Sequence, residues 1–372
     1  MSSRGKLVPP SNTVTGNALN IIVKVVLLFI VPVLVLAQAD APARARSFGL
    51  KLLTEAKLPG LSMAVAIGDS VVWSEGFGFA NVERQTPATS ATRFRIGSVT
   101  KLLTAAAAAR LYEQGKLDLD APVQRYVPSF PEKRETITTR QLLGHLSGIR
   151  HYGRNEFLNR HFYKSVREAL TIFQNDSLLF PPGIRYSYSS YGYVLASAVI
   201  EHASGMEFLQ YLKEDVFNPL SLRSIGPDMN DSADRSQAYP YSLDSLGNWA
   251  PGPFNDNSNR WGAGGFLSTS GDIVRFGSSL LNDGFLIAST RQLLFTSQKT
   301  IQGKETGVGL GWRISRDSAG IQYFHHGGES IGGRAYLLMY PRSKVVVALL
   351  TNMTFARIGE KEALELARMF TK

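Results

Sequence analysis

Cysteine is the one residue type that this 372-residue sequence lacks altogether. Its absence excludes a disulfide framework and an anchor through a lipid-modified cysteine. Folding must therefore depend on a hydrophobic core, and 44% of the residues are hydrophobic, which is enough for one large globular domain. A disordered chain is not expected from this composition.

Strong charge is also lacking. The net charge of +10 is modest for the length, and no five consecutive residues carry charge of one sign. Three of the cations, Arg4, Lys6 and Lys24, precede residue 40, so the rest of the chain carries +7. With no nucleic-acid motif present either, we expect no nucleic-acid partner. The six histidines show no ligand spacing such as His-Glu-x-x-His, so neither a metal nor another cofactor is expected.

The first 39 residues have the pattern of an export signal. They carry no acidic residue, and their apolar stretch, Val25–Ala37, leads to Ala37-Gln38-Ala39, which predicts cleavage after Ala39. The stretch is shorter than the roughly 20 residues that span a bilayer, and Pro32 interrupts it. An uncleaved membrane anchor remains an alternative, because Ile21–Val23 lengthens the apolar segment. We therefore expect a periplasmic or secreted protein that meets the membrane only through this segment.

Hydrophobic patterning after residue 40 predicts an α/β (α+β) fold, a single domain over residues 40–372. Leu61–Ile67 and Val71–Phe77 flank Gly68-Asp69-Ser70 and are typical of a β-hairpin. Further strands and a final helix are expected near the C-terminus, at Val308–Ile314, Ile321–Phe324, Ala335–Tyr340, Val345–Thr351 and Glu360–Phe370. Residues 58–80 and 306–372 would thus build one antiparallel sheet.

Residues 115–305 are predicted to form a helical and loop-rich part. Here and just before it, helices are expected at Ser98–Gln114, Thr139–Leu146, Ser165–Phe173 and Tyr191–Ala203. Asp228–Asn259 is rich in Ser, Asp, Asn and Pro and has no periodicity, so it is interpreted as a long loop. Loops of that length often form functional rims.

A Ser-x-x-Lys pattern, Ser98 to Lys101, stands at the start of the first predicted helix. Residues three apart share a helical face, so the amine can reach the hydroxyl. A lysine with a lowered pKa can then activate the serine as a nucleophile. The same pattern occurs at Ser3 to Lys6, and Ser98 as a simple N-cap beside a solvated Lys101 remains an alternative.

Two later stretches carry candidate partners. Tyr188 and Ser190 lie in a hydroxyl-rich turn before a predicted helix, although a tyrosine cluster that only packs on the core is an alternative. His325-His326-Gly327-Gly328 forms a strand edge that ends in glycines. Backbone amides at such glycines can approach a substrate closely and complete an oxyanion hole.

Five motifs in this order resemble the serine β-lactamase-related family, which includes class C β-lactamases, D-Ala-D-Ala peptidases and esterases. They are Phe94–Lys101, Leu142–Ile149, Pro182–Tyr193, Gly262–Thr269 and His325–Gly328. Two segments, Gly115–Pro128 and His145–Tyr152, are most similar to the mitochondrial serine β-lactamase-like branch of animals and its bacterial relatives. The resemblance implies a β-lactamase/transpeptidase-like fold.

The resemblance also implies catalytic roles. Ser98 would be the acylated nucleophile, and Lys101 would accept its proton or hold it in a shared network. Tyr188, as a phenolate or through Lys101, would carry protons to the leaving group and to the deacylating water. His325 would stand where class C enzymes have lysine. Within the Leu-Ser-Gly motif, His145 is interpreted as structural, orienting a loop by hydrogen bonds.

Substrate contacts are implied at three further positions. The Gly328 amide would pair with the Ser98 amide as the oxyanion hole, and Ser190 and Gly327 would bind substrate. The family usually has asparagine where this chain has Ser190, which cannot donate and accept as an amide does. His325 in place of a lysine weakens constant attraction to a carboxylate. Both departures argue against efficient β-lactam hydrolysis.

A rival hydrolase pattern is Gly328-Glu329-Ser330-Ile331-Gly332, a Gly-x-Ser-x-Gly match. An α/β-hydrolase would need a helix after Ser330 and a later acid and histidine, but a strand pattern follows and no histidine comes after His326, so Ser330 is interpreted as a turn residue. We therefore expect an exported serine hydrolase, a peptidase or esterase acting on a small-molecule or peptide substrate. A non-catalytic binding or assembly module is the alternative, and the oligomeric state stays open.

Overall fold

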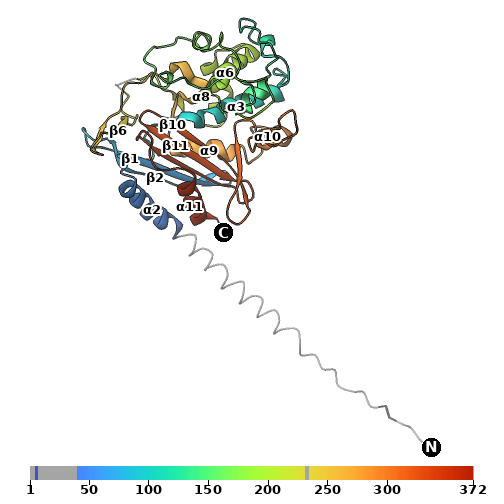
Figure 1. The fold of residues 1–372 in the computed structure, drawn as a ribbon. Helices are drawn as coiled ribbons and strands as arrows, with labels where there is room; N and C mark the ends of the chain where they lie inside the picture. Colours follow the sequence, from blue (N-terminus) through green and yellow to red (C-terminus); the bar gives the residue numbers. More distant parts are fainter. Residues whose placement is uncertain (1–4, 7–39, 231–233, 372) are drawn as a thin grey trace, which may run out of the picture. The chain divides into compact units, whose positions relative to one another are not determined.

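The computed structural model describes residues 5–6, 40–230 and 234–371 (Figure 1). The export signal predicted for residues 1–39 lies outside the described residues, except for Gly5 and Lys6. Helix α2 (Ala41–Glu55) begins in a first unit that ends at Ala45, and the chain from Arg46 onward forms a second, compact unit. Within the described ranges, no helix combines the length and apolarity needed to cross a membrane.

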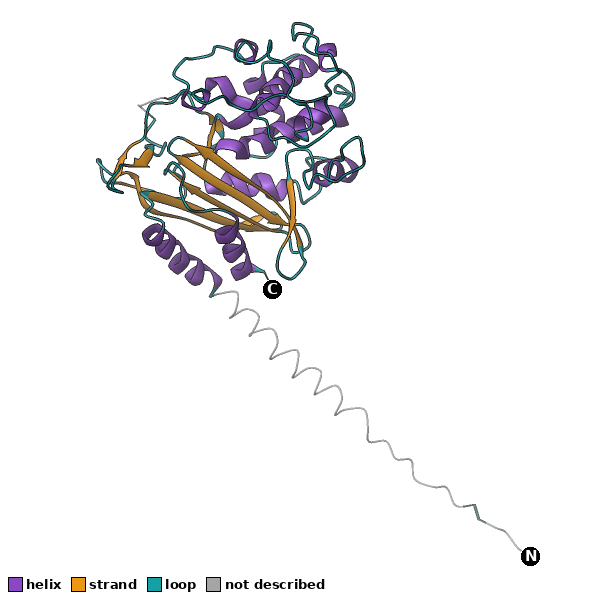
Figure 2. Ribbon diagram, viewed as in Figure 1, coloured by secondary structure: helices purple, strands orange, loops and turns teal. Residues whose placement is uncertain are grey.

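A seven-stranded antiparallel sheet organises the second unit, in the order β3-β2-β1-β12-β11-β10-β9 (Figure 2). The strands are β1 (Gly60–Ile67), β2 (Ser70–Asn81), β3 (Thr86–Pro87), β9 (Arg313–Arg316), β10 (Gln322–Ser330), β11 (Gly333–Tyr340) and β12 (Val345–Thr351). The predicted hairpin is confirmed as β1 and β2, and β1 pairs with β12 from Leu61↔Thr351 to Ile67↔Val345. Both ends of the chain thus share one sheet, as predicted.

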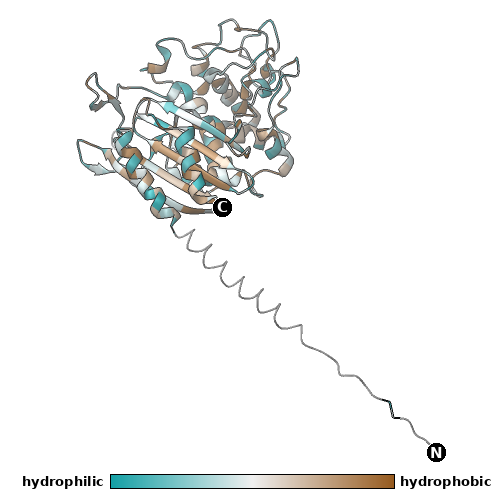
Figure 3. Cartoon of the chain, turned by 60° about the horizontal axis from the view of Figure 1, so that its bottom comes forward, coloured by the Kyte–Doolittle hydropathy of each residue, from teal (hydrophilic) through white to brown (hydrophobic). Residues whose placement is uncertain are grey.

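Helices cover the sheet because its central strands are apolar on both faces. Every residue of β12 is buried, and only the last residue of β1 is partly exposed. Helix α9 (Ser270–Ser279) packs on β1 and β12, and helix α11 (Glu360–Phe370) packs on β11 and β12. Figure 3 shows the hydrophobic strands with α11 in front, its turns alternating in hydropathy. The predicted α/β fold is confirmed.

Helix α3 (Thr100–Glu113) is the centre of the helical part (Figure 1). Its five consecutive alanines, 105–109, are all buried, so α3 packs closely against α6 (Ser190–Ser204) and α8 (Trp261–Gly264). Small side chains allow such close helix packing without an exposed polar face. The other helical segments are η2 (Val123–Arg125), α4 (Thr139–Leu143), η3 (Glu156–Leu158), α5 (Val166–Leu170), α7 (Phe208–Tyr211), η4 (Leu212–Phe217), η5 (Ser258–Arg260) and α10 (Ala288–Phe295).

The predicted loop Asp228–Asn259 contains regular structure. Strands β6 (Tyr241–Leu243) and β7 (Trp249–Pro251) form a two-stranded hairpin, and η5 begins at Ser258. Elements of three residues are too short to show a periodicity, so the sequence pattern missed them. The prediction of a structureless loop was wrong in this respect.

Two strand predictions near the C-terminus need correction. The strand expected at Val308–Ile314 begins only at Arg313, and β10 continues through its glycines to Ser330. Ser330 is therefore the buried last residue of a strand rather than a turn residue. Because strand β11 follows, the helix that an α/β-hydrolase needs after its nucleophile is not there.

Candidate active site

Ser98 lies in a 3-10 turn, η1 (Gly97–Val99), directly before α3. Strand β4 (Phe94–Arg95) leads into this turn and pairs with β8 (Phe266–Ser268). Gly97 has a φ of +49°, and a Cβ there would lie 2.4 Å from the Glu329 backbone nitrogen. The turn therefore packs backbone to backbone against β10, which holds the Ser98 hydroxyl between the sheet and the helices.

Lys101 is fully buried beneath Ser98. Its Nζ donates to Ser98 Oγ at 3.0 Å, to Ser190 Oγ at 3.0 Å and to the Ala263 carbonyl at 2.6 Å. Burial lowers the pKa of Lys101 well below its ordinary value of 10.5, and the nearby Arg260 and Arg313 lower it further. The amine reaches the serine as the i, i+3 spacing predicts, and the alternative of a solvated lysine is wrong. A neutral amine here can accept the serine proton.

Tyr188 lies over the same pair. Its ring centroid is 4.9 Å from Lys101 Nζ, and its ring packs on His145 at 4.4 Å between centroids. Burial raises the pKa of the Tyr188 phenol far above 10, and hydrogen bonding with Ser98 only partly opposes this. The phenol thus carries its proton at neutral pH. Of the two forms the family pattern implies, this environment favours a phenol that works through Lys101 over a free phenolate.

Two histidines hold the turn that presents Ser190. His145 Nδ1 accepts from the Ser189 amide at 3.1 Å, and His151 Nδ1 accepts from the Ser190 amide at 3.2 Å. Burial lowers the pKa of His145 well below 6.5 and that of His151 to about 4, so both rings stay neutral and can accept. The loop-orienting role predicted for His145 is confirmed. His151 was not predicted, although it stands in the same motif segment.

His325 is not where the sequence prediction places it. Its Nδ1 lies 2.7 Å from the Tyr336 hydroxyl and its Nε2 lies 2.9 Å from Ser315 Oγ, so both ring nitrogens are engaged away from Ser98. The next residue, His326, lines the cavity instead, with its ring centroid 6.1 Å from that of Tyr188. Neighbouring strand residues point to opposite faces. The assignment to His325 was wrong by one position.

His326 is buried, and its Nδ1 donates to the Gly327 carbonyl at 2.6 Å. A neutral imidazole that donates through Nδ1 leaves Nε2 as an acceptor. Burial lowers the pKa of His326 well below 6.5, and Lys101 and Arg313 lower it further. The ring is therefore neutral, unlike a lysine at the same place.

Gly327 and Gly328 both line the cavity, and at Gly328 the lack of a side chain is required. A Cβ on Gly328 would lie 1.9 Å from the Ile96 carbonyl and 3.1 Å from the Ser98 nitrogen. A Cβ on Gly327 would lie 3.2 Å from the Tyr336 ring. Only glycine lets the backbone of β10 approach the Ser98 turn this closely.

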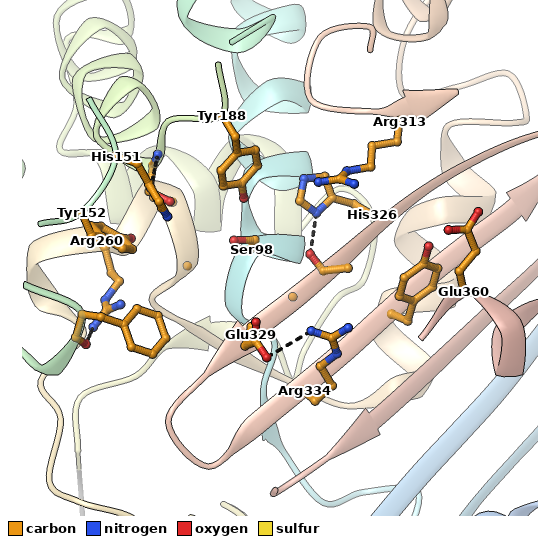
Figure 4. Close-up of a pocket in the computed structure, with 17 residues that line it drawn as sticks. Ser98, His151, Tyr152, Tyr188, Arg260, Arg313, His326, Glu329, Arg334 and Glu360 are labelled. Carbon is orange, nitrogen blue, oxygen red and sulfur yellow. Dashed lines mark hydrogen bonds and ion pairs between the residues drawn. The ribbon is translucent and has the colours of Figure 1, made fainter. Parts of the chain in front are cut away.

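The cavity at Ser98 has a volume of about 410 Å³ (Figure 4). Five of the seven predicted site residues line it: Ser98, Tyr188, Ser190, Gly327 and Gly328. Lys101 lies beneath Ser98, and His326 rather than His325 lines the cavity. Sequence reasoning missed the other lining residues, which are His151, Tyr152, Phe157, Arg260, Ala263, Gly264, Arg313, Glu329, Arg334, Tyr336 and Glu360. Ala263 and Gly264 lie within a predicted motif and Glu329 directly follows one, whereas Arg313 and Glu360 lie outside the motifs, where no local pattern marked them.

A buried lysine bonded to a serine, roofed by a tyrosine and set against the edge of an antiparallel sheet, defines the class of β-lactamases and penicillin-binding proteins. The comparison with protein families agrees: the beta-lactamase family profile matches residues 44–367. The chain belongs to this family, whose members are generally serine hydrolases.

Individual relatives cover most of the chain. The human serine beta-lactamase-like protein LACTB, mitochondrial, is 29% identical over 87% of this chain and 78% of its own. Penicillin-binding protein 4 of Amycolatopsis lactamdurans is 31% identical over 81% and 82%. Among solved structures, the penicillin binding protein from Bacillus halodurans superposes with a TM-score of 0.73 at 26% identity, over 86% of this chain and 98% of that one.

Proposed function

We propose that this protein is a serine hydrolase that cleaves a peptide or ester through an acyl-enzyme on Ser98. The observation that carries the proposal is Lys101, which is fully buried, has its pKa lowered, and donates to Ser98 Oγ at 3.0 Å. A scaffold would gain nothing from a buried amine that burial destabilises. A hydrolase needs one as a base.

Acylation would proceed by proton transfer and attack. Lys101 accepts the proton of Ser98 Oγ as this oxygen bonds to the substrate carbonyl carbon. The negative charge that develops on the carbonyl oxygen is met by the backbone amides of Ser98 and Gly328. When the tetrahedral intermediate collapses, the leaving group takes a proton from the Tyr188 phenol, which Lys101 reprotonates. Water then repeats these steps in reverse and releases the acid.

Peptide or ester substrates are favoured over β-lactams. Ser190 donates and accepts through one short hydroxyl, and its oxygen is occupied by Lys101 at 3.0 Å. His326 is held neutral by burial, so it offers no permanent charge to a β-lactam carboxylate. Export to the periplasm or beyond the cell is part of the proposal and rests on the pattern of residues 1–39 alone.

Active-site labelling tests the proposal. The protein is incubated with a fluorophosphonate and, separately, with a penicillin between roughly pH 6 and 9, which brackets histidine and lowered lysine pKa values. Intact-mass measurement should show one adduct on the wild type and none on Ser98→Ala.

Ser330→Ala is the matched control, because Ser330 belongs to the rival Gly-x-Ser-x-Gly pattern and lies outside the cavity lining. It should label like the wild type. A wild type that gains no adduct at any pH, or labelling that survives in Ser98→Ala, would sink the hydrolase proposal. Assembly that persists in Ser98→Ala, measured by light scattering, would then favour the binding-module alternative.

A further inference from the structure

Arg260 is a buried cation at one end of the cavity. Its residue is 2% exposed, and its guanidinium lies over the rings of Phe157 and Tyr152, at 4.9 and 5.1 Å from their centroids. Its Nη2 donates to the Phe157 carbonyl at 2.6 Å and to Asn255 Oδ1 at 3.1 Å. Its Nε has no hydrogen-bond partner among the described residues.

The charge of Arg260 is uncompensated in the part of the chain that the structure describes, where no carboxylate oxygen lies within 4.0 Å of it. Other buried or half-buried arginines are paired. Arg95 lies 2.7 Å from Asp228, Arg150 lies 2.6 Å from Glu156, and Arg334, also in the cavity, lies 3.2 Å from Glu329. A buried charge without a partner is costly. Arg260 therefore stands out as a group arranged for something that the free protein does not contain.

The position of Arg260 points to the substrate. Figure 4 shows Arg260 with His151 and Tyr152 on one side of Ser98, and Arg313 with His326 on the other side. A substrate whose carbonyl sits at Ser98 extends to both sides, so one half reaches toward Arg260. The positive charge of Arg260 acts on groups at Ser98, because it helps to lower the pKa of Lys101 and of His151.

We propose that Arg260 recognises a carboxylate in one half of the substrate, so that the enzyme prefers an acidic residue beside the bond it cleaves. This inference rests on the proposed hydrolase function. A guanidinium offers planar N–H donors that match a carboxylate, and the aromatic rings around it exclude competing water. Binding of the carboxylate would supply the missing counter-charge.

Isosteric substrate pairs test the preference in each half. For the acyl side, the aminomethylcoumarin amides of N-acetyl-glutamate and N-acetyl-glutamine are compared. For the leaving-group side, N-acetyl-alanyl-glutamate amide is compared with N-acetyl-alanyl-glutamine amide. Each pair is measured in L and D forms. In one half, kcat/KM should favour glutamate by about 10- to 100-fold, the range of a charge-assisted hydrogen bond. The ratio within a pair cancels any change in the basicity of Lys101.

Variants assign the preference to Arg260. In Arg260→Gln, the kcat/KM values for the glutamate and glutamine substrates should differ by less than about threefold. In Arg260→Lys, which keeps the charge without the planar guanidinium, a substantial part of the glutamate preference should survive. Arg313→Gln, on the other side of Ser98, is the matched control and should keep the ratio in that half. No glutamate preference in either half, or a preference lost in Arg313→Gln and kept in Arg260→Gln, overturns the inference.

Binding to Ser98→Ala separates this inference from the hydrolase proposal. Calorimetric titration should show N-acetyl-glutamate amide binding about tenfold or more tightly than N-acetyl-glutamine amide, with the difference lost when Arg260→Gln is added. Equal binding of the two amides overturns the inference even if Ser98 is a proven nucleophile. Unequal binding supports it even if no probe labels Ser98.

Discussion

The two walls of the cavity are built on different principles. The helical wall carries Ser98 and Tyr188 above the buried Lys101, whose Nζ donates to Ser98 Oγ at 3.0 Å. The strand wall, β10, places one histidine in the cavity and its neighbour on the opposite face, and relies on glycines for close backbone approach. In the proposed mechanism, the helical wall supplies the proton transfer and the strand wall supplies the backbone geometry that holds the substrate carbonyl.

This difference predicts unequal sensitivity to mutation. In the proposed mechanism, changes on the helical wall remove a group that carries the proton. Changes on the strand wall should act only at positions that face the cavity. The predictions below compare the walls, from the largest expected effect to the smallest.

Lys101→Met should cause the largest loss. Methionine keeps the length and removes the base, so kcat/KM for an activated ester should fall by at least about 10³-fold. Lys133→Met is the control, because Lys133 is another lysine with a lowered pKa but lies outside the cavity. It should stay within about threefold of the wild type. A Lys101→Met enzyme that remains active would mean that the helical wall does not supply the base.

Tyr188→Phe should come second. It leaves the ring that packs on His145 and removes the phenol, so kcat should fall by about 10²- to 10³-fold, as expected for a lost proton-transfer group. Tyr186→Phe, which alters another ring near His145, is the comparison and should change kcat little. Equal losses in both variants would indicate a packing effect rather than proton transfer.

The adjacent histidines provide the sharpest test of the strand wall. His326→Ala should lower kcat/KM by about 10- to 100-fold because it removes a polar group that faces the reaction. His325→Phe should keep kcat/KM within about threefold, although losing the bonds to Tyr336 and Ser315 should lower the melting temperature. A reversed order would restore the assignment of the cavity position to His325.

Among the changes on the helical wall, Ser190→Ala should lower activity the least. It removes one of three acceptors around Lys101 Nζ, and we expect kcat/KM to fall by about 3- to 10-fold. Ser187→Ala, three residues earlier and outside the cavity lining, is the control. A loss as large as that of Tyr188→Phe would show that Ser190 takes part in proton transfer itself.

The buried Lys101 should also make the free energy of unfolding depend on pH. The pKa of Lys101 is lowered in the folded state below its unfolded value of 10.5. At pH values between the folded and the unfolded pKa, the unfolded chain therefore binds more protons than the folded chain. The free energy of unfolding should therefore rise with pH in that window, by up to about 1.4 kcal/mol per pH unit for one proton. Urea unfolding at several pH values should show this slope in the wild type and a shallower one in Lys101→Met. Parallel curves would mean that Lys101 is not neutral when folded.

Much of the fold was predictable because its signals are local. The hairpin β1–β2 follows from a turn between two apolar runs, and the Ser98–Lys101 contact follows from helical periodicity over three residues. The short strands within Asp228–Asn259 gave no periodic signal. The choice between His325 and His326 failed because a shift of one residue on a strand reverses the face.

The sequence by itself determined the family, the sheet shared by both chain ends and the contact between Ser98 and Lys101, since ordered motifs and local periodicity specify these. Only the tertiary structure decided that Lys101 and Tyr188 are uncharged, because their charge states depend on burial by distant segments. It also decided that His326 and Arg260 face Ser98, since strand register and chain crossings bring them there from more than 150 residues away.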